Sequence, residues 1–215
     1  YRRVSFSAVP CRGPPPTPVR RPAPVVTQPL AWLLRQILAL DALVVDLILA
    51  LRFPLLTKLM TSVTGLGSAS AAVVLLGVCY LAGWRREVWV AAPALLLSGV
   101  VVASLMAYVG RPFPPQPVCV TSATGLAPHS FPSGHAAAVT VFALVARHSK
   151  SLPAAPVAGL AALVAFSRLY LCTHFLSDTV AGVAIGAAAV VIVRAFLVHR
   201  PDARPGSSHQ TLSDD

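Results

Sequence analysis

The sequence predicts an all-α protein, a polytopic transmembrane helical bundle of five to six membrane helices. Of its 215 residues, 56% are hydrophobic and only 11% are charged, whereas soluble domains carry about 25% charged residues. Apolar stretches close to the ~20 residues that cross a bilayer recur along the chain. Such a chain needs lipid as part of its solvent, which excludes an ordinary water-soluble domain.

The predicted bundle lies between two polar tails. Residues 1–29 are rich in proline and arginine and contain no acidic residue, so they predict a disordered basic tail. Residues 30–200 hold the membrane helical bundle, and residues 201–215 predict a second, polar and disordered tail.

The first candidate helix, Leu30–Leu51, has two interpretations that the sequence leaves open. It is long enough to span a bilayer, but it contains Arg35, Asp41 and Asp46. Charged side chains within a membrane span are costly. A helix that lies in the membrane interface therefore fits as well as a spanning one.

Five further apolar stretches follow, the third of them short, at residues 65–84, 88–109, 134–148, 152–171 and 176–198. If they alternate across the membrane, the basic residues after the first, third and fifth share one side: Arg85, Arg86, Arg147, Lys150, Arg194, Arg200 and Arg204. That side is expected to be cytoplasmic. Much of the net charge of +10 therefore sets topology, and nucleic acid is not an expected partner. In the last stretch, Gly182 and Gly186 predict close helix packing within the bundle.

The opposite, outer side receives residues suited to binding a phosphate. Arg111 and Arg168 offer guanidinium forks that match phosphate oxygens. Ser133 is a good cap for the helix that follows it, and Gly134 lets the backbone approach a ligand. The free amides at such a helix start form a seat for an anion.

Two histidines on the same side could supply the chemistry. His174 and Asp178 are four residues apart, so they share one helix face. The carboxylate could hold one imidazole nitrogen and leave the other as a nucleophile. His135 would then act as acid and base. Each residue alone also suits a structural role, such as a helix cap or an interfacial anchor, but together they predict a phosphoryl-transfer site.

Three motifs carry a resemblance to a known family. They are Arg-Pro at 111–112, Pro-Ser-Gly-His at 132–135, and Ser167-Arg168 followed by His174 and Asp178. In these motifs the chain resembles the type 2 phosphatidic acid phosphatase superfamily, which also includes vanadium haloperoxidases, over about residues 65–198. The resemblance implies a membrane lipid phosphate phosphatase that works without a metal or other cofactor. It also implies roles for individual residues: His174 as the nucleophile that forms a phosphohistidine, Asp178 as its partner, His135 as general acid, and Arg111, Arg168, Ser133 and Gly134 as phosphate ligands.

Ser104 departs from the family pattern. It lies seven residues before Arg111, where the family usually has lysine. A hydroxyl donates one hydrogen bond without charge, and loss of a charge-assisted contact typically costs ~1.5–3 kcal/mol. Ser104 remains a candidate phosphate ligand, but this difference keeps open an alternative function: a catalytically weak, phospholipid-binding membrane protein of the same fold.

The acidic residues of the predicted bundle argue against a metal centre. Residues 30–200 contain only four: Asp41, Asp46, Glu87 and Asp178. A two-metal phosphatase needs several ligands converging on one place.

The expected partners are a lipid phosphate substrate and membrane lipid. The site is expected on the outer face of the cell membrane. The candidate substrates that the resemblance implies are polyprenyl diphosphate, phosphatidate and phosphatidylglycerol phosphate. The excess of arginine over lysine indicates a GC-rich, bacterial genome, which favours the polyprenyl substrate.

Overall fold

The computed structural model describes residues 27–118 and 129–198, and every regular element in these ranges is helical. The predicted tails lie outside the described residues, except for residues 27–29, which begin the first helix. The elements are α1 (Thr27–Leu51), α2 (Pro54–Thr64), a short 3₁₀ helix η1 (Gly65–Gly67), α3 (Ala69–Leu81), α4 (Arg85–Val109), α5 (Gly134–Arg147), α6 (Ala154–Tyr170) and α7 (Leu176–Val198).

The chain divides into two compact units at Ile37. The larger unit contains the second part of α1 and all of the helices that follow it. All of the predicted site residues also belong to this unit.

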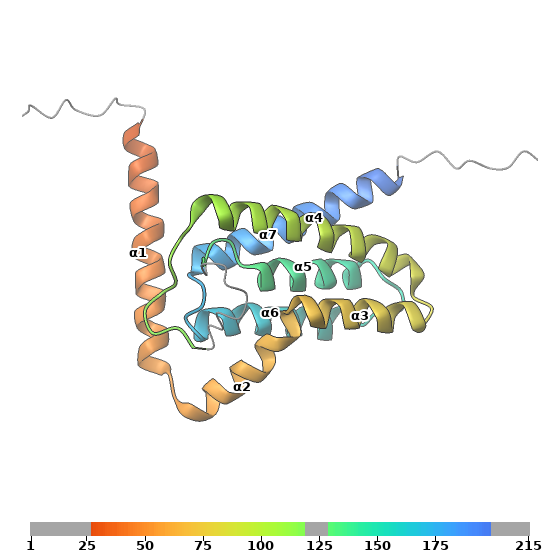
Figure 1. The fold of residues 1–215 in the computed structure, drawn as a ribbon, viewed down its shortest axis with the longest axis horizontal. Coiled ribbons are helices and arrows are strands. Elements are labelled where there is room, and N and C mark those ends of the chain that lie inside the picture. The colour runs from red at the N-terminus through yellow and green to blue at the C-terminus, as the bar shows by residue number, and fades with distance from the viewer. Residues whose placement is uncertain (1–26, 119–128, 199–215) are drawn as a thin grey trace, which may run out of the picture. The chain divides into compact units, whose positions relative to one another are not determined.

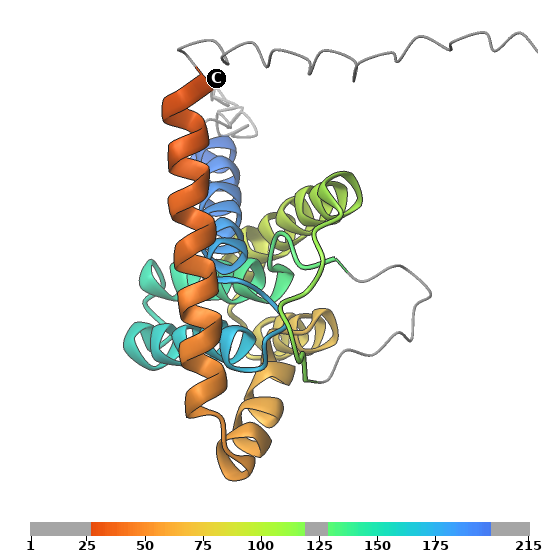
Figure 2. The ribbon, with the colours of Figure 1, turned by 90° about the vertical axis from the view of Figure 1, so that its left-hand side faces the viewer.

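Helix α5 is the centre of the bundle. It packs against α4, α6 and α7, and it lies beside α6 in both views of the ribbon (Figure 1 and Figure 2). Small residues allow this close packing, since Ala136, Ala137 and Ala146 on α5 are almost fully buried. A Cβ atom at Gly182 of α7 would press against the carbonyl oxygen of Ser133, just before α5, and one at Gly186 against that of Ala137 in α5. The prediction that these two glycines allow close helix packing is therefore confirmed.

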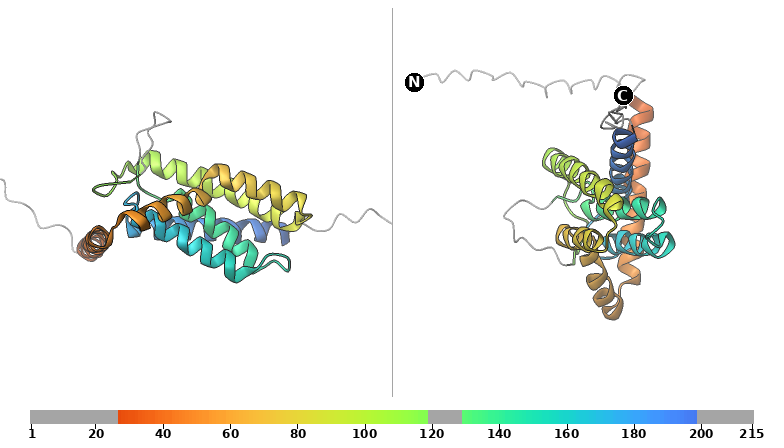
Figure 3. Two further views of the ribbon diagram at one scale, coloured as in Figure 1. Left: turned by 90° about the horizontal axis from the view of Figure 1, so that it is seen from below. Right: turned by 90° about the vertical axis from the view of Figure 1, so that its right-hand side faces the viewer.

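Two helices, α4 and α7, are long and apolar enough to cross a membrane. The pair formed by α2 with η1 and α3 passes the same test as one segment bent by 59° (Figure 3). The apolar helices α5 and α6 are shorter, with 14 and 17 residues. The apolar stretch predicted from the sequence begins only at residue 65 and so omits α2. The reason is that α2 contains Thr57, Lys58 and Thr61, which lower its hydropathy.

One end of the bundle gathers the segments that carry the predicted site. Helices α4 and α6 end on the side where α5 and α7 begin (Figure 1). The backbone amide of Ser133, before α5, donates to the carbonyl oxygen of Asp178 on α7 at 3.0 Å. The amide of Ser130 donates to the carbonyl oxygen of Arg111, just after α4, at 2.7 Å. These hydrogen bonds join the three predicted motifs at one place.

Candidate active site

His174 lies in the tight connection between α6 and α7 and is only 4% exposed. Its Nδ1 atom is 2.5 Å from the carbonyl oxygen of Ser130. Because a carbonyl oxygen only accepts hydrogen bonds, Nδ1 must carry the proton, and the lone pair of the neutral ring lies on Nε2. The edge of the Phe113 ring also packs against the imidazole, with ring centroids 6.5 Å apart.

The surroundings of His174 favour the neutral ring. Burial lowers the pKa of His174 from its ordinary value of 6.5 to about 3, and the nearby positive charge of Arg168 acts in the same direction. His135 also lies close enough to lower this pKa, while the hydrogen bond to Ser130 opposes the shift. The ring is therefore unprotonated at neutral pH, as a nucleophile must be.

Asp178 does not orient His174 through a hydrogen bond, contrary to the expectation from their spacing. The nearest carboxylate oxygen is 4.0 Å from Nδ1 of His174, and the Ser130 carbonyl occupies the hydrogen-bonding position. Instead, Oδ2 of Asp178 accepts the backbone N–H of Phe175 at 2.8 Å, and Oδ1 accepts Nη1 of Arg111 at 2.5 Å. The physical reason is that a carboxylate in the first turn of a helix readily accepts the free amides there.

Arg111 is held by two buried carboxylates. Besides Asp178, it pairs with Asp41 of α1, whose Oδ2 atom is 2.8 Å from Nη2. Nη1 also donates to the hydroxyl of Ser177 at 2.8 Å, and the guanidinium lies 3.9 Å from the centre of the Phe175 ring. These contacts use three of the five N–H donors of an arginine. The guanidinium is thus fixed in place with donors left for a ligand.

Asp41 completes this cluster and was missed as a site residue in the sequence. It is 2% exposed and accepts three hydrogen bonds, from Arg111, from the backbone N–H of Ser177 at 2.9 Å and from the Ser177 hydroxyl at 2.6 Å. The available signal was a carboxylate within an apolar helix, which generally marks a functional or paired group. Asp46 on the same helix gives the same signal but is exposed.

Arg168, near the end of α6, is connected to α2. Its Nη1 atom donates to Oγ1 of Thr64 at 2.9 Å, and Thr64 is buried. The resemblance placed the family's core from residue 65 onward, so the sequence did not indicate a role for α2. The structure shows that the last residue of α2 contacts one of the predicted phosphate-binding arginines.

The start of α5 provides free amides next to these side chains. The hydroxyl of Ser133 accepts the amide of Ala136 at 3.4 Å, and the Ser133 carbonyl accepts the amide of Ala137 at 3.1 Å. The amides of Gly134 and His135 precede these bonds and have no partner within the helix. Together with the helix dipole, free amides of this kind can bind an anion.

His135 packs against the break between α2 and α3. A Cβ atom at Gly67 of η1 would lie 3.0 Å from Cδ2 of His135 and 2.7 Å from Cγ1 of Val164 on α6. Only glycine therefore fits at this position without movement of its neighbours. The short helix η1 thus packs directly against the His135 side chain.

Ser104 is the predicted site residue that the described structure does not join to the others. Its side chain is exposed on α4, and its hydroxyl donates to the carbonyl oxygen of Val100 one turn earlier at 2.9 Å. The packing around Gly134 does not require glycine, because a Cβ atom there would make only an ordinary contact of 3.5 Å with Val102.

The assembled residues match the requirements of phosphoryl transfer. A neutral imidazole offers Nε2 as a nucleophile, two arginines and a helix start offer positive charge, and a second histidine lies nearby. Such preorganised donors stabilise the charge of a transferring phosphoryl group. Among residues 27–118 and 129–198, no three His, Cys, Asp or Glu side chains are grouped so that they could hold a metal ion.

The chain is similar in sequence to known proteins. The sequence profile of the PAP2 superfamily matches residues 87–201, which is more than half of the chain. The decaprenylphosphoryl-5-phosphoribose phosphatase of Mycobacterium tuberculosis, in two strains, is 33% identical over 121 residues. That alignment covers 56% of this chain and 67% of the relative.

Two solved structures share the fold. The crystal structure of Aquifex aeolicus LpxE matches with a TM-score of 0.59 and 29% identity, over 70% of this chain and 92% of that chain. The PAP2 type phosphatidylglycerolphosphate phosphatase from Bacillus subtilis matches with a TM-score of 0.63 over 83% of this chain and all of that chain, but at 22% identity it shows the fold alone. The chain therefore belongs to the PAP2 superfamily and is a phosphatase of the lipid phosphate class.

Proposed function

We propose that this phosphatase works through a phosphohistidine intermediate on His174 and needs no metal ion. The observation that carries the proposal is the hydrogen bond from Nδ1 to the Ser130 carbonyl. This bond fixes the tautomer in which Nε2 holds the lone pair. The low pKa of about 3 keeps the lone pair available.

The reaction then has two steps. In the first, Nε2 of His174 attacks phosphorus and the bond from phosphorus to the lipid oxygen breaks. His135 gives a proton to that oxygen from its imidazolium form, which the negative charge of the bound phosphate favours. In the second, His135 takes a proton from water as the water oxygen attacks phosphorus, and the N–P bond breaks. The products are the dephosphorylated lipid, inorganic phosphate and neutral His174.

The phosphate is held by Arg168 and by the amides at the start of α5. Arg111 contributes its remaining N–H donors, and its position is fixed by Asp178 and Asp41. In this mechanism Asp178 acts mainly on Arg111 and on the turn that carries His174. That role differs from a carboxylate bonded directly to the nucleophile.

The substrate we propose is a polyprenyl lipid phosphate. The relative from Mycobacterium tuberculosis is named for decaprenylphosphoryl-5-phosphoribose, which is a polyprenyl lipid. The arginine-rich composition of this chain, with 15 arginines and two lysines, favours the same class through a bacterial origin.

We further propose that the site opens to the outer face of the cell membrane. The basic residues Arg85, Arg86, Lys150 and Arg194 lie towards the opposite end of the helices that carry the site. An excess of Lys and Arg marks the cytoplasmic side of membrane proteins.

Phosphate release from purified protein tests this function. Wild type is incubated in detergent, with EDTA, with decaprenylphosphoryl-5-phosphoribose, polyprenyl diphosphate, phosphatidate and phosphatidylglycerol phosphate. We expect release from a polyprenyl substrate and a loss of roughly 10³-fold or more in His174→Ala, because the nucleophile is removed.

His148→Ala is the matched control, since His148 is an exposed histidine at the other end of α5. This variant should keep full activity. Turnover that survives in His174→Ala, or that requires added metal, would contradict the mechanism. A wild-type protein that binds these lipids but releases no phosphate from any of them would support the catalytically weak alternative.

A further inference from the structure

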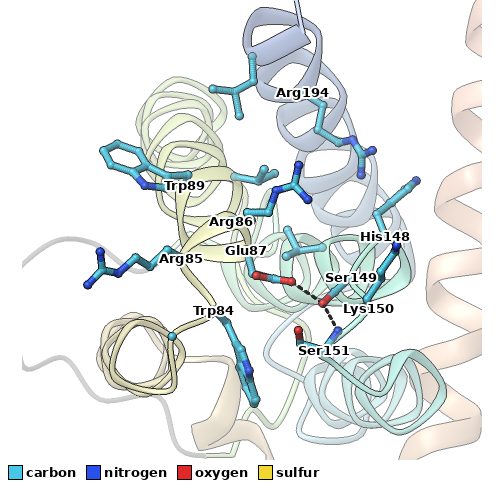
Figure 4. Close-up of a pocket in the computed structure, with 14 residues that line it drawn as sticks. Trp84, Arg85, Arg86, Glu87, Trp89, His148, Ser149, Lys150, Ser151 and Arg194 are labelled. Atoms are coloured by element: carbon cyan, nitrogen blue, oxygen red, sulfur yellow. Dashed lines mark hydrogen bonds between the residues drawn. The ribbon is translucent and has the colours of Figure 1, made fainter.

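A basic cavity lies at the end of the bundle opposite the candidate active site. It has a volume of about 750 Å³ and is formed by the start of α4 and the ends of α5 and α7 (Figure 4). Helix α4 runs for 25 residues between the two regions, which corresponds to about 37 Å. The cavity is therefore separate from the residues assigned to phosphate hydrolysis.

Positive charge dominates the cavity lining. Four of the residues that line it are lysine or arginine and only one, Glu87, is acidic; the Glu87 carboxylate accepts the Ser149 hydroxyl at 2.5 Å. Figure 4 shows Arg86 of α4 and Arg194 of α7 pointing towards the same space between these helices. Arg85 points away from them and lies 5.4 Å from the centre of the Tyr80 ring.

The start of α4 adds backbone donors to this charge. Trp84, at the N-cap position, makes no side-chain capping hydrogen bond, and the first amide with a helical partner is that of Val88. The amides of Arg85, Arg86 and Glu87 therefore face the cavity end of the helix without partners inside it. A helix start of this kind attracts phosphate groups.

The cavity also has an apolar part. Val90, Val145 and Leu197 line it together with Trp84 and Trp89, and Trp89 is 70% exposed. Exposed tryptophan is typical of the membrane–water interface, where its ring packs beside lipid glycerol and acyl groups. A small soluble anion would gain nothing from this apolar surface, whereas a phospholipid would use both parts.

We propose that this cavity binds the phosphate head group of an anionic phospholipid. Arg86 and Arg194 contact the phosphate, and the free amides of α4 contribute further donors. Trp89 and Leu197 contact the glycerol and the first part of the acyl chains. Basic pockets between membrane helices are known to suit such head groups.

Tryptophan fluorescence tests the proposal directly. The chain has three tryptophans, so a Trp32→Phe variant leaves only Trp84 and Trp89 as reporters. This protein is reconstituted into nanodiscs of phosphatidylcholine that contain increasing amounts of brominated phosphatidylglycerol, or of brominated phosphatidylcholine as the neutral comparison. We expect saturable quenching at low fractions of phosphatidylglycerol and none of comparable affinity with the neutral lipid.

Charge variants distinguish binding in the cavity from a general attraction of anionic lipid to the basic residues at this end of the bundle. One basic side chain near an anionic lipid contributes roughly a factor of five in affinity, so Arg86→Gln and Arg194→Gln should each weaken binding about fivefold, and the double variant roughly thirtyfold. Arg147→Gln is the matched control, because Arg147 is exposed at the same end of α5 but does not line the cavity. Equal loss in Arg147→Gln, or equal quenching by both lipids, would overturn the proposal.

A second arm distinguishes lipid from soluble phosphate. The same protein in pure phosphatidylcholine nanodiscs is titrated with inorganic phosphate at constant ionic strength. We expect no saturable change of fluorescence. A saturable response that Arg86→Gln abolishes, without a preference for phosphatidylglycerol, would overturn the assignment to a lipid.

Discussion

The buried cluster around Arg111 gives the sharpest prediction about stability. Asp41 accepts three hydrogen bonds, one from Arg111 and two from Ser177, and its side chain is 3% exposed. Asp41→Ala removes all three and leaves the donors away from water. Breaking a buried ion pair by removing one partner typically costs ~3–5 kcal/mol.

The expected cost here is lower because Arg111 keeps other partners. Its side chain is 18% exposed, and it retains Asp178 and the Ser177 hydroxyl. We therefore expect Asp41→Ala to lower the free energy of unfolding by about 2–3 kcal/mol. Asp41→Asn keeps an oxygen that can accept from Ser177 but loses the ion pair, so about 1–2 kcal/mol is expected.

Equilibrium unfolding in mixed micelles measures these changes, and Asp46→Ala is the control. Asp46 lies on the same helix but is exposed, so its substitution should change stability by no more than about 0.5 kcal/mol. Asp41→Ala should also reduce kcat/KM about tenfold, since Arg111 loses one of its two anchors. Equal stabilities of the Asp41→Ala and Asp46→Ala variants would show that the buried ion pair of Asp41 does not stabilise the fold.

Three further predictions concern the site itself. Gly67→Ala forces a methyl group against His135 and should lower kcat at least tenfold. Gly65→Ala should leave kcat unchanged, because a Cβ atom there would have nothing within 4 Å. Equal effects of the two changes on kcat would contradict the close packing. The pKa of His174 is lowered from 6.5 to about 3, so its ring should stay neutral as the pH falls through 6.5. Between pH 6.5 and 3 only the unfolded chain takes up this proton, and the folded protein should therefore lose stability as the pH falls. Titration of His174 near 6.5, measured by NMR of labelled imidazole rings, would contradict this. Ser104→Lys adds a charged donor and should raise kcat/KM about tenfold, and an unchanged value in steady-state assays would place Ser104 outside the phosphate site.

Much of the fold could be predicted because the signals are local. Hydropathy identified the apolar parts of α3 to α7, and the alternation of these helices brought Arg111, His135 and His174 to one end. Helix α2 was not predicted, because its threonines and lysine interrupt the apolar pattern. Its contribution, the contact from Thr64 to Arg168, joins residues 104 positions apart, and no local pattern reports such a contact.

The details of the site depend on backbone groups that residue types do not reveal. The spacing of His174 and Asp178 predicted that both lie on one helix face, but His174 lies in the connection before α7 begins. A main-chain carbonyl at Ser130 is the atom that binds the imidazole. Likewise, the charge of Asp41 was visible in the sequence, but its partner Arg111 is 70 residues away. Which of several acceptors a side chain uses is decided by tertiary packing.

In the proposed mechanism, His174 carries the phosphoryl group during turnover. The most direct measurement uses a substrate labelled with ³²P in the phosphate, rapid quenching in base, and peptide mapping of the labelled protein. We expect label on the peptide that contains His174, stable in base and lost in acid, formed in the presence of EDTA and absent in His174→Ala. Phosphate release by wild type with no labelled protein at any quench time, or label on a different residue, would contradict it.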